Sequence, residues 1–511
     1  MASILSRENA YPIALGLVAI LAVRMIAGWI RRPKYLPGPP RLPLVGNLFD
    51  MPESESWVTY NKWKETYGDA IYLEILGSPL VILNSYKACI DLLEKKSDIY
   101  SDRPIGIMAN ILMGWNKAVM MSPYNDRWRR FRRITAQSMR KDAIKQFHPI
   151  QEREVARFLG SLLEDPDHYM ENFRLAAGRS LLWNVYGLPV DDSNNPIITT
   201  TEKAMEIGVF AAQPGNFLVD FFPALQYVPS WFPGTGWKEF ARKGRVLAHD
   251  MAEIPFDMTL KEIKSGNNEP SFTSINLGKN EDPDIVKWCS GSMLAAGADT
   301  SVASVHAFFL TMTLFPEVQK RCQAEIDAVT GGTRLPEIAD RDSLPFLSAT
   351  MWEMMRWQPV SPLALPHRVL KDDIYNGCFI PAGTVILGNT WDPELFEEPD
   401  KFIPERYLPY FDKSIPHDPA KLPLEPNEFA FGYGRRICAG MHYAETMFLI
   451  SIARVLSTFD ITKVKDANGN EITPELKFNS SIVRETLEFP CVIKPRSEAA
   501  RALVLSSLKS I

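Results

Sequence analysis

Helical periodicity organises most of this chain, and the strand patterns between the helices are few and short. The helical patterns cover residues 57–67, 86–96, 126–147, 151–163, 283–315, 316–330 and 441–459. The strand patterns cover 71–76, 80–83, 375–380 and 384–387, and Gly77-Ser78-Pro79 is expected to form a hairpin turn. Pro316 suits a first helical turn, and Gly331-Gly332 is expected to end the helix that it opens. These patterns predict a mainly α-helical (α+β) fold with small β-sheets beside the helices.

A length of 511 residues suggests about three domains, but no segment resembles a linker, so we expect a single large domain. Hydrophobic residues make up 46% of the chain and charged residues 23%, which excludes an intrinsically disordered protein. The net charge of −5 argues against nucleic acid as a partner, since binding it requires a basic surface. The 6 cysteines show no CxxC spacing, which excludes a disulfide scaffold and a paired zinc or redox motif and favours reduced thiols facing the cytosol.

The stretch from Ala10 to Ile30 is largely apolar and is close to the ~20 residues that a membrane-spanning helix requires. Arg31, Arg32 and Lys34 follow it at once, so the positive-inside rule leaves the rest of the chain on the cytoplasmic side. A cleaved signal peptide is the alternative, but its basic residues would precede the apolar stretch. We therefore expect four parts: a membrane anchor at 1–32 with its helix at about 10–30, a proline-rich spacer at 33–40, a main domain at 41–495 and a C-terminal tail at 496–511.

Chemistry concentrates around Cys438, which lies among glycines and arginines in the segment from Phe431 to Gly440. Glycines allow a tight turn and a close approach of the backbone to a flat ligand or to the sulfur. Backbone N–H groups and the N-terminus of the helix expected from residue 441 favour the thiolate over the thiol. A thiolate is one of the axial ligands of haem iron. A buried structural cysteine is the alternative, but it would not require three glycines and two arginines around it.

This segment resembles the signature of the cytochrome P-450 haem-thiolate monooxygenases, Phe-x-x-Gly-x-Arg-x-Cys-x-Gly, at Phe431, Gly434, Arg436, Cys438 and Gly440. The resemblance extends over nearly the whole chain after the predicted anchor, with the motifs in the order found in the family. It implies the cytochrome P-450 fold and a haem b cofactor (iron protoporphyrin IX), which the residues of this signature would bind. Cys438 would be the axial ligand of the haem iron.

The segment Ala296-Gly297-Ala298-Asp299-Thr300 lies inside the long helical pattern 283–315. Small residues in a helix allow a flat group to pack close to the backbone, and the Thr300 hydroxyl can donate to the Ala296 carbonyl four residues back. Taken alone, a glycine and a threonine in a helix more often serve packing. The resemblance implies that this is the oxygen-binding groove, in which Thr300 helps to deliver protons to bound dioxygen and Asp299 is its acidic neighbour. Thr300 and Asp299 are therefore the expected catalytic residues.

Trp128 and Arg132 match the family pattern Trp-x-x-x-Arg, and the resemblance implies that both meet the haem propionates. Arg103, His367 and Arg436 also match propionate contacts, and a guanidinium binds a carboxylate in bidentate fashion. A solvated basic helix face is the alternative interpretation of the segment around Trp128. The remaining cations of this region could face an acidic electron-donor protein: Arg127, Arg129, Arg130, Arg133, Arg140 and Lys141.

Glu353 and Arg356 stand at positions i and i+3 of a helix, which by itself signifies little because exposed pairs contribute ~0–1 kcal/mol. The resemblance implies that they interlock with Arg406 as a buried triad near the proximal side of the haem, with a structural rather than a catalytic role. The sequence departs from the family where Trp391 and Asp392 abut, since the family usually carries a few more residues there. Either a loop is shortened or a short piece of the coding sequence is missing.

The resemblance implies a membrane-anchored monooxygenase that uses O2 and electrons from NADPH to hydroxylate or otherwise oxidise a hydrophobic small molecule. The electrons would come through NADPH-cytochrome P-450 reductase. The protein would be a single-pass protein of the endoplasmic reticulum membrane, with the catalytic domain facing the cytosol. Two alternatives stay open: a haem-thiolate isomerase or dehydratase without external electrons, which usually lacks the acid–threonine pair, and a non-enzymatic haem-binding protein.

The segments that match substrate-facing regions of the family are overwhelmingly apolar, which favours a terpenoid or a similar hydrophobic skeleton. These segments are 105–115, 205–210, 294–298, 363–366 and 480–483. Glu206 is the exception, and helical spacing could turn it outward. A cationic amine substrate would require an uncompensated acid in the pocket, and the sequence offers no convincing one. Similarities at 112–115, 231–234 and 431–434 are to the fungal members that serve secondary metabolism.

Overall fold

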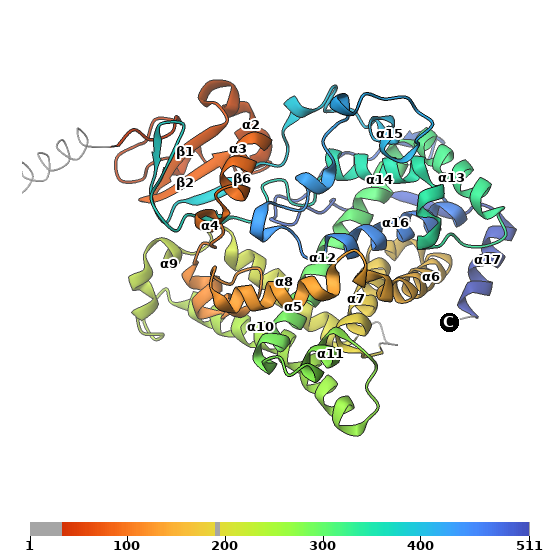
Figure 1. Ribbon diagram of the computed structural model, residues 1–511, viewed down its shortest axis with the longest axis horizontal. Helices are drawn as coiled ribbons and strands as arrows, with labels where there is room; N and C mark the ends of the chain where they lie inside the picture. Colours follow the sequence, from red (N-terminus) through yellow and green to blue (C-terminus); the bar gives the residue numbers. More distant parts are fainter. Residues whose placement is uncertain (1–32, 190–194, 510–511) are drawn as a thin grey trace, which may run out of the picture.

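The structure, a computed structural model, describes residues 33–189 and 195–509, so the anchor predicted at 10–30 lies outside the described residues. A sheet-rich part with β1, β2 and β6 lies at one end of the molecule, and helices dominate the rest (Figure 1). The longer helices are α2 (Ser56–Tyr67), α5 (Asp126–Met139), α6 (His148–Glu164), α7 (Tyr169–Tyr186), α8 (Pro196–Ala212), α10 (Gly236–Ser265), α11 (Phe272–Gly278), α12 (Pro283–Leu314), α13 (Pro316–Thr330), α14 (Pro345–Trp357), α16 (Met441–Thr458) and α17 (Glu498–Leu508). Short helices are α3 (Tyr86–Cys89), α4 (Ser97–Tyr100), α9 (Leu218–Phe221) and α15 (Leu408–Phe411).

Three small sheets accompany the helices. The largest has the order β1 (Ala70–Ile75), β2 (Ser78–Leu83), β6 (Val385–Gly388), β3 (His367–Arg368), with β2 and β6 parallel and the other two pairs antiparallel. A hairpin is formed by β4 (Asp373–Tyr375) and β5 (Cys378–Ile380), and β7 (Phe459–Lys465) lies between β8 (Glu471–Ile472) and β9 (Cys491–Pro495). Because β6 pairs with both β2 and β3, it holds the segment from His367 against the first part of the chain.

Helix α12 passes through the middle of the helical part and packs against α7, α10 and α16 (Figure 1). Most of its residues are buried, as expected for a helix that is apolar on nearly every face. Within the described residues it is the one helix that is long and apolar enough to cross a membrane, but 67% of the relevant window is buried inside the protein. Its apolar character therefore reflects its place in the core.

Most predicted elements are confirmed, including α13 from Pro316 with Gly331 in the left-handed conformation at its end. The helical pattern 126–147 is interrupted, because Arg140 has an extended backbone between α5 and a 3₁₀ turn at Ala143–Phe147. The pattern concealed this break, since Met139, Ile144 and Phe147 are all buried in one cluster. The predicted tail 496–511 contains α17, which packs against α6 and α16.

Two strand predictions require correction. The predicted strand 375–380 is the β4–β5 hairpin, whose turn is formed by Asn376 and Gly377 at φ 51° and 73°. The turn expected at Gly77-Ser78-Pro79 is formed instead by Leu76 and Gly77, at φ 49° and 82°. Both are two-residue connections with positive φ at each central residue, which suits the twist of the flanking strands.

Candidate functional site

Cys438 lies in the loop between a short 3₁₀ turn, η13 (Gly434–Arg436), and the start of α16. The Cys438 N–H donates to the Phe431 carbonyl over 2.8 Å and closes the loop on itself. Gly434 has a φ of 55°, and a Cβ atom there would lie 2.2 Å from the Leu93 carbonyl oxygen. Only glycine fits this close approach, so the signature glycine has a definite steric reason.

The Cys438 sulfur lies in a recess, accessible to solvent yet largely surrounded by protein. Burial has the largest influence and raises the pKa of the Cys438 thiol, and a hydrogen bond from the Gly440 N–H and the charge of Arg132 offset only part of this rise. Helix α16 begins at Met441, so the positive end of its dipole lies close by. These contacts supply the N–H donor and the positive charges that the sequence predicted for a thiolate.

The five residues expected to meet the propionates lie together. Trp128, Arg103, His367 and Arg436 are buried, Arg132 is half-buried, and the Arg436 guanidinium lies 4.4 Å from the centre of the Trp128 ring. Burial and the repulsion of Arg103 lower the pKa of Arg436 to about 8. The structure therefore concentrates positive charge at one place in the interior.

These cations have backbone carbonyls as partners, and none of them forms an ion pair within residues 33–189 and 195–509. Arg103 donates to the carbonyls of Met120, Leu365 and Pro366 over 3.0, 2.8 and 2.6 Å. Arg436 donates to the carbonyls of Ser101 and Ser122 over 2.8 Å each. Arg132 donates to the Ile437 carbonyl over 2.7 Å. Burying charge without a counter-ion is costly. Two carboxylates would offset that cost, so these residues fit the propionates of a haem.

His367 lies in β3 and contacts the same cluster. Its Nδ1 lies 2.7 Å from the Tyr100 carbonyl oxygen, and because a carbonyl only accepts, Nδ1 carries the proton. Burial and the charges of Arg103 and Arg436 hold the pKa of His367 well below its ordinary range. The imidazole is therefore neutral at pH 7.

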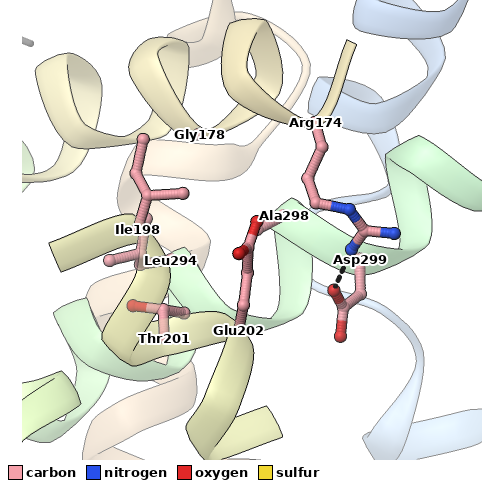
Figure 2. Close-up of a pocket in the computed structure, with 8 residues that line it drawn as sticks. All are labelled: Arg174, Gly178, Ile198, Thr201, Glu202, Leu294, Ala298 and Asp299. Carbon is pink, nitrogen blue, oxygen red and sulfur yellow. Dashed lines mark hydrogen bonds and ion pairs between the residues drawn. The ribbon is translucent and has the colours of Figure 1, made fainter. Parts of the chain in front are cut away.

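Asp299 and Thr300 leave α12 in different directions. The Thr300 hydroxyl donates to the Ala296 carbonyl over 2.8 Å, which confirms the predicted bond. Asp299 accepts from Arg174 of α7 over 3.1 Å (Figure 2). Burial is the largest influence on this carboxyl and raises its pKa to about 6. Its proton is therefore exchangeable close to neutral pH.

A cleft of about 780 Å³ opens beside Asp299, between α7, α8 and the segment 479–485. This volume lies in the range of roughly 300–1,000 Å³ that is typical of small-molecule sites. Its apolar lining includes Leu175, Ile198, Met205, Val209, Phe210 and Val483, and its carboxylates are those of Glu171, Glu202, Glu206, Asp299 and Glu485. Figure 2 shows a small recess with Arg174, Glu202 and Asp299 in its lining.

The cleft has carboxylates beside its apolar lining, and the exposed Glu206, the one exception named for the substrate-facing segments, is among them. Glu206 lines the cleft, and Glu202 stands one helical turn before it on α8. Neither forms an ion pair within the part of the chain that the structure describes, and burial raises the pKa of Glu202. Part of the cleft wall is therefore acidic.

Glu353, Arg356 and Arg406 are brought together as the resemblance implied. Glu353 and Arg356 form a bidentate pair with N–O distances of 2.7 and 2.8 Å, and both side chains are almost completely buried. Arg406 Nε lies 3.4 Å from a Glu353 oxygen. Arg356 also donates to the carbonyls of Pro399 and Lys401, so the triad fixes the segment that leads to Arg406.

The basic face of α5 is partly neutralised by neighbouring acids. Arg129 pairs with Asp126, Arg133 pairs with Glu281 over 2.8 Å, and Arg127 pairs with Asp284 over 2.7 Å. The exposed cations without an ion pair among the described residues are Arg130, Arg140 and Lys141. Of the six cations predicted to be available to a partner protein, these three are therefore the ones without an acidic partner among the described residues.

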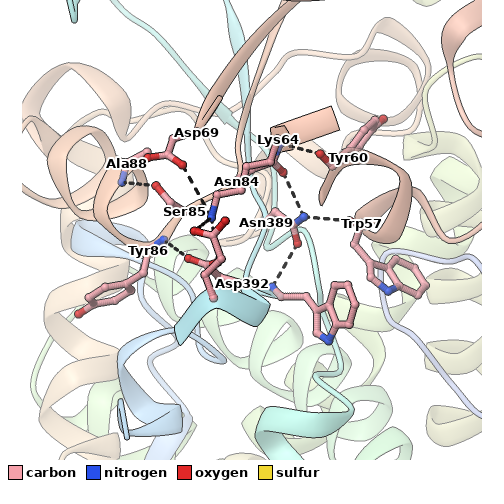
Figure 3. A network of polar contacts seen from close by, with 12 residues as sticks. Trp57, Tyr60, Lys64, Asp69, Asn84, Ser85, Tyr86, Ala88, Asn389 and Asp392 are labelled. Atoms are coloured by element: carbon pink, nitrogen blue, oxygen red, sulfur yellow. Dashed lines mark hydrogen bonds and ion pairs between the residues drawn. The ribbon is translucent and has the colours of Figure 1, made fainter. Parts of the chain in front are cut away.

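The stretch in which Trp391 and Asp392 abut belongs to a network of polar contacts (Figure 3). The buried Asp392 carboxylate accepts from Lys64 Nζ over 3.1 Å and from the Tyr86 N–H over 3.2 Å. Asn389 donates to the Trp57 carbonyl over 2.9 Å. Loop 389–392 is thereby tied to α2 and to the start of α3. The short connection is compatible with a satisfied polar network at this place.

Sequence reasoning missed Arg174 and Glu202. Arg174 lies 125 positions before its partner Asp299, on a helix that no pattern predicted. No signal in the sequence could have identified that pairing. Glu202 stands just outside the predicted substrate-facing range 205–210, and its i, i+4 spacing from Glu206 was the available signal.

Comparison with known proteins adds independent evidence. The family model described as Cytochrome P-450 matches residues 36–489. The chain is 40% identical over 502 residues to cytochrome P-450 monooxygenase 208 of Postia placenta, with 96% of each chain covered. It is 38% identical over 511 residues to cytochrome P-450 monooxygenase claR of Ampulloclitocybe clavipes, covering 98% of this chain and 94% of the relative. It is 39% identical over 508 residues to cytochrome P-450 monooxygenase ple1 of Rhodocybe pseudopiperita, with 96% of each covered.

Proposed function

Because this chain belongs to the cytochrome P-450 family, we propose that it is a membrane-anchored monooxygenase that oxidises a hydrophobic small molecule with electrons from NADPH. Membership itself makes the protein an oxidoreductase of the monooxygenase type, which uses O2, a redox partner and haem held through a cysteine thiolate. The observation that carries the site assignment is the group of buried cations, paired only with carbonyls in the described residues, beside the accessible Cys438.

Haem, when bound here, supplies the activation of dioxygen and the oxidation of an unactivated C–H bond. In the proposed site, Cys438 would hold the haem iron through its thiolate, and Arg103, Arg132 and Arg436 would bind the propionates. The Thr300 hydroxyl donates a hydrogen bond to the Ala296 carbonyl, so its oxygen is available to accept a hydrogen bond in the groove. Burial raises the pKa of Asp299 to about 6, so this carboxyl is mostly ionised at pH 7 but can take up and release a proton readily. Arg174 connects this carboxyl with the cleft.

Substrate-dependent NADPH oxidation by the protein with a reductase tests the monooxygenase against its two alternatives. We expect the wild type to consume NADPH and form oxidised product, and Thr300→Ala to form much less product for each NADPH. An isomerase or dehydratase would convert substrate without NADPH, and a haem carrier would convert none. The carbon monoxide difference spectrum of the ferrous protein should show thiolate ligation, and Cys438→Ala should abolish it. Absence of NADPH consumption by the wild type would refute the proposal.

The redox partner is proposed to be NADPH-cytochrome P-450 reductase, docking on the exposed cations of α5 and the loop that follows it. Arg130 is exposed and without an ion pair in the described residues, whereas Arg129 is engaged with Asp126. Arg130→Glu should weaken turnover driven by the reductase and leave turnover driven by peroxide unchanged. Arg245→Glu, on α10, is a matched control. Equal loss of both kinds of turnover in Arg130→Glu would contradict docking at this face.

The membrane is proposed as a second partner, through the predicted anchor and through an exposed apolar segment at 218–232. Leu218, Phe222, Tyr227, Trp231 and Phe232 are 64%, 50%, 81%, 81% and 52% exposed. Large apolar side chains gathered at one surface are typical of membrane or protein contacts. A chain without residues 1–32 should still float with phosphatidylcholine vesicles. The same chain with Tyr227→Ser and Trp231→Ser should float much less, and equal flotation would contradict this role of the segment.

The substrate is proposed to be a terpenoid or a related fungal secondary metabolite. The support is the apolar wall of the cleft, formed by Met205, Val209, Phe210 and Val483, and the fungal relatives. Membranes from cells that express the protein should be incubated with a panel of fungal terpene skeletons, including hydroxylated ones. We expect NADPH-dependent oxidation of some members. Oxidation confined to small polar molecules would contradict this substrate class.

A further inference from the structure

A buried polar network holds the first turn of α16, directly after the Cys438 loop. The Tyr443 hydroxyl lies 2.7 Å from Ser180 Oγ of α7, and Asn184 of the same helix donates to that hydroxyl over 3.4 Å. Gln151 of α6 donates to the Tyr443 carbonyl over 3.0 Å and accepts from Thr446 over 2.9 Å. The start of α16 is thus bonded to two other helices.

All five members of this network are almost completely buried, with exposed fractions between 0% and 6%. Hydrogen bonds in such surroundings are costly to break, because water cannot replace the lost partner. The Phe147 ring packs edge-on against the Tyr443 ring, with 6.0 Å between centres. Tyr443 therefore has little freedom to shift.

The same turn controls the donor that faces the Cys438 sulfur. The Gly440 N–H bonds to the sulfur, and the carbonyl of Gly440 accepts from the Ala444 N–H over 2.9 Å. Ala444 is the neighbour of Tyr443, so a displacement of this turn moves the Gly440–Met441 peptide and, through the Gly440 Cα atom, the Gly440 N–H on the preceding peptide. Hydrogen bonds to a ligating sulfur tune the reduction potential of the metal centre, because they withdraw electron density from the thiolate.

We propose that Tyr443 is a positioning residue, which acts through Ser180 and Asn184 to hold the Gly440 N–H against the Cys438 sulfur and thereby sets the reduction potential of the haem. The inference rests on the proposed function, since it requires haem ligated by Cys438. Loss of the tyrosine hydroxyl leaves the ring and its packing in place. It releases the turn, weakens the N–H to sulfur bond and leaves more electron density on the sulfur. The ferric form of the haem is then stabilised relative to the ferrous form.

The test is a potentiometric titration of the full-length, haem-loaded protein, followed by its absorption spectrum. Tyr443→Phe should bind haem at the wild-type ratio and show a more negative potential. Ser180→Ala removes the partner of the hydroxyl without any change in α16, and it should shift the potential in the same direction. The matched control is Ser451→Ala, because the buried Ser451 hydroxyl donates only to the Met447 carbonyl within α16, over 2.6 Å. Its potential should equal that of the wild type.

A wild-type potential in Tyr443→Phe would overturn the inference, even if the variant unfolds at a lower temperature, since that combination indicates a merely structural role. If Tyr443→Phe does not bind haem, Ser180→Ala decides in the same way. An equal shift in Ser451→Ala would also overturn it, because the effect would then be general to α16. Failure of the proposed function gives a different result, namely a wild-type protein without thiolate ligation in its carbon monoxide difference spectrum.

Discussion

Replacement of Arg356 by leucine should lower the free energy of unfolding by about 3–5 kcal/mol. The change leaves the Glu353 carboxylate, whose side chain is 0% exposed, with the Ile403 N–H at 2.8 Å and Arg406 at 3.4 Å as its remaining partners. It also removes the donor from the carbonyls of Pro399 and Lys401. Since a folded protein is typically stable by about 5–15 kcal/mol, this loss is a large part of the total.

The assay is urea unfolding of the purified protein, together with the ratio of haem to protein after expression. We expect a lower urea midpoint and incomplete haem loading in Arg356→Leu, because the triad fixes the segment before Arg406. The fraction that does hold haem should turn over at the wild-type rate, since none of the three side chains is assigned to the chemistry. Glu353→Leu should lose at least as much stability, because it leaves Arg356 and Arg406 without their shared counter-ion.

The double variant Glu353→Leu/Arg356→Leu provides the control. Replacing both partners avoids an unpaired buried charge in the pair, so its loss of stability should be smaller than the sum of the two single losses by about 0.5–3 kcal/mol. Strict additivity would refute the reasoning, because it would mean that the two charges do not depend on each other. A wild-type urea midpoint in Arg356→Leu would refute it as well.

Three further predictions concern other parts of the site. Gly434→Ala should lower the haem-to-protein ratio strongly, because its Cβ would lie 2.2 Å from the Leu93 carbonyl oxygen, whereas Gly432→Ala, which has a positive φ but no such contact, should lower it less. Burial raises the pKa of Asp299 from 3.8 to about 6, so the protonated carboxyl stabilises the folded state most below pH 3.8, and this contribution is lost as the pH rises through about 6. In Asp299→Asn the urea midpoint should therefore depend less on pH over this range than in the wild type. Lys64→Met removes the cation of the buried pair in Figure 3 and should cost about 3–5 kcal/mol in urea unfolding, whereas a loss below about 1 kcal/mol would show that the network contributes little.

Local signals predicted the elements whose ends are marked in the sequence. Helix α13 begins at Pro316 and ends before Gly331, as its punctuation indicates. The β4–β5 hairpin was missed although Asn376-Gly377 is the strongest short hairpin signal, because the apolar run around it was taken as one strand. Helix α10 was not predicted by any pattern, and it holds the buried Pro255 in its interior, where proline ordinarily breaks a helix. In α10 the burial of Pro255 outweighs its local tendency to break a helix, whereas the hairpin follows its own local Asn-Gly signal.

The candidate site likewise contains features that the sequence predicts, where the residues are close in the chain, and features that it cannot predict, where they are far apart. Cys438, Arg436 and Gly434 are close in sequence, so their spacing alone indicated a ligand-binding loop. Arg133 and Glu281 are 148 positions apart, and no local pattern reveals that this cation is already engaged. Free cations on a surface can be predicted only after the fold has placed the acids around them. For this reason the sequence could not reveal that three of the six cations predicted for the docking face are already in ion pairs.

The substrate preference shows the same limit most clearly. An apolar pocket was predicted from the composition of segments, and Met205, Val209 and Val483 are among the apolar residues that line the cleft. Acidic chemistry comes partly from outside those segments, because Glu171 belongs to α7 and Glu202 precedes the range on α8, and partly from Glu206 within the range. Like charges at i and i+4 destabilise a helix by about 0.2–0.5 kcal/mol, so the acidic wall is not explained by the stability of α8. A hydrophobic skeleton that carries hydrogen-bond donors can pack against the apolar residues and donate to the carboxylates. A plain hydrocarbon can make only the first kind of contact.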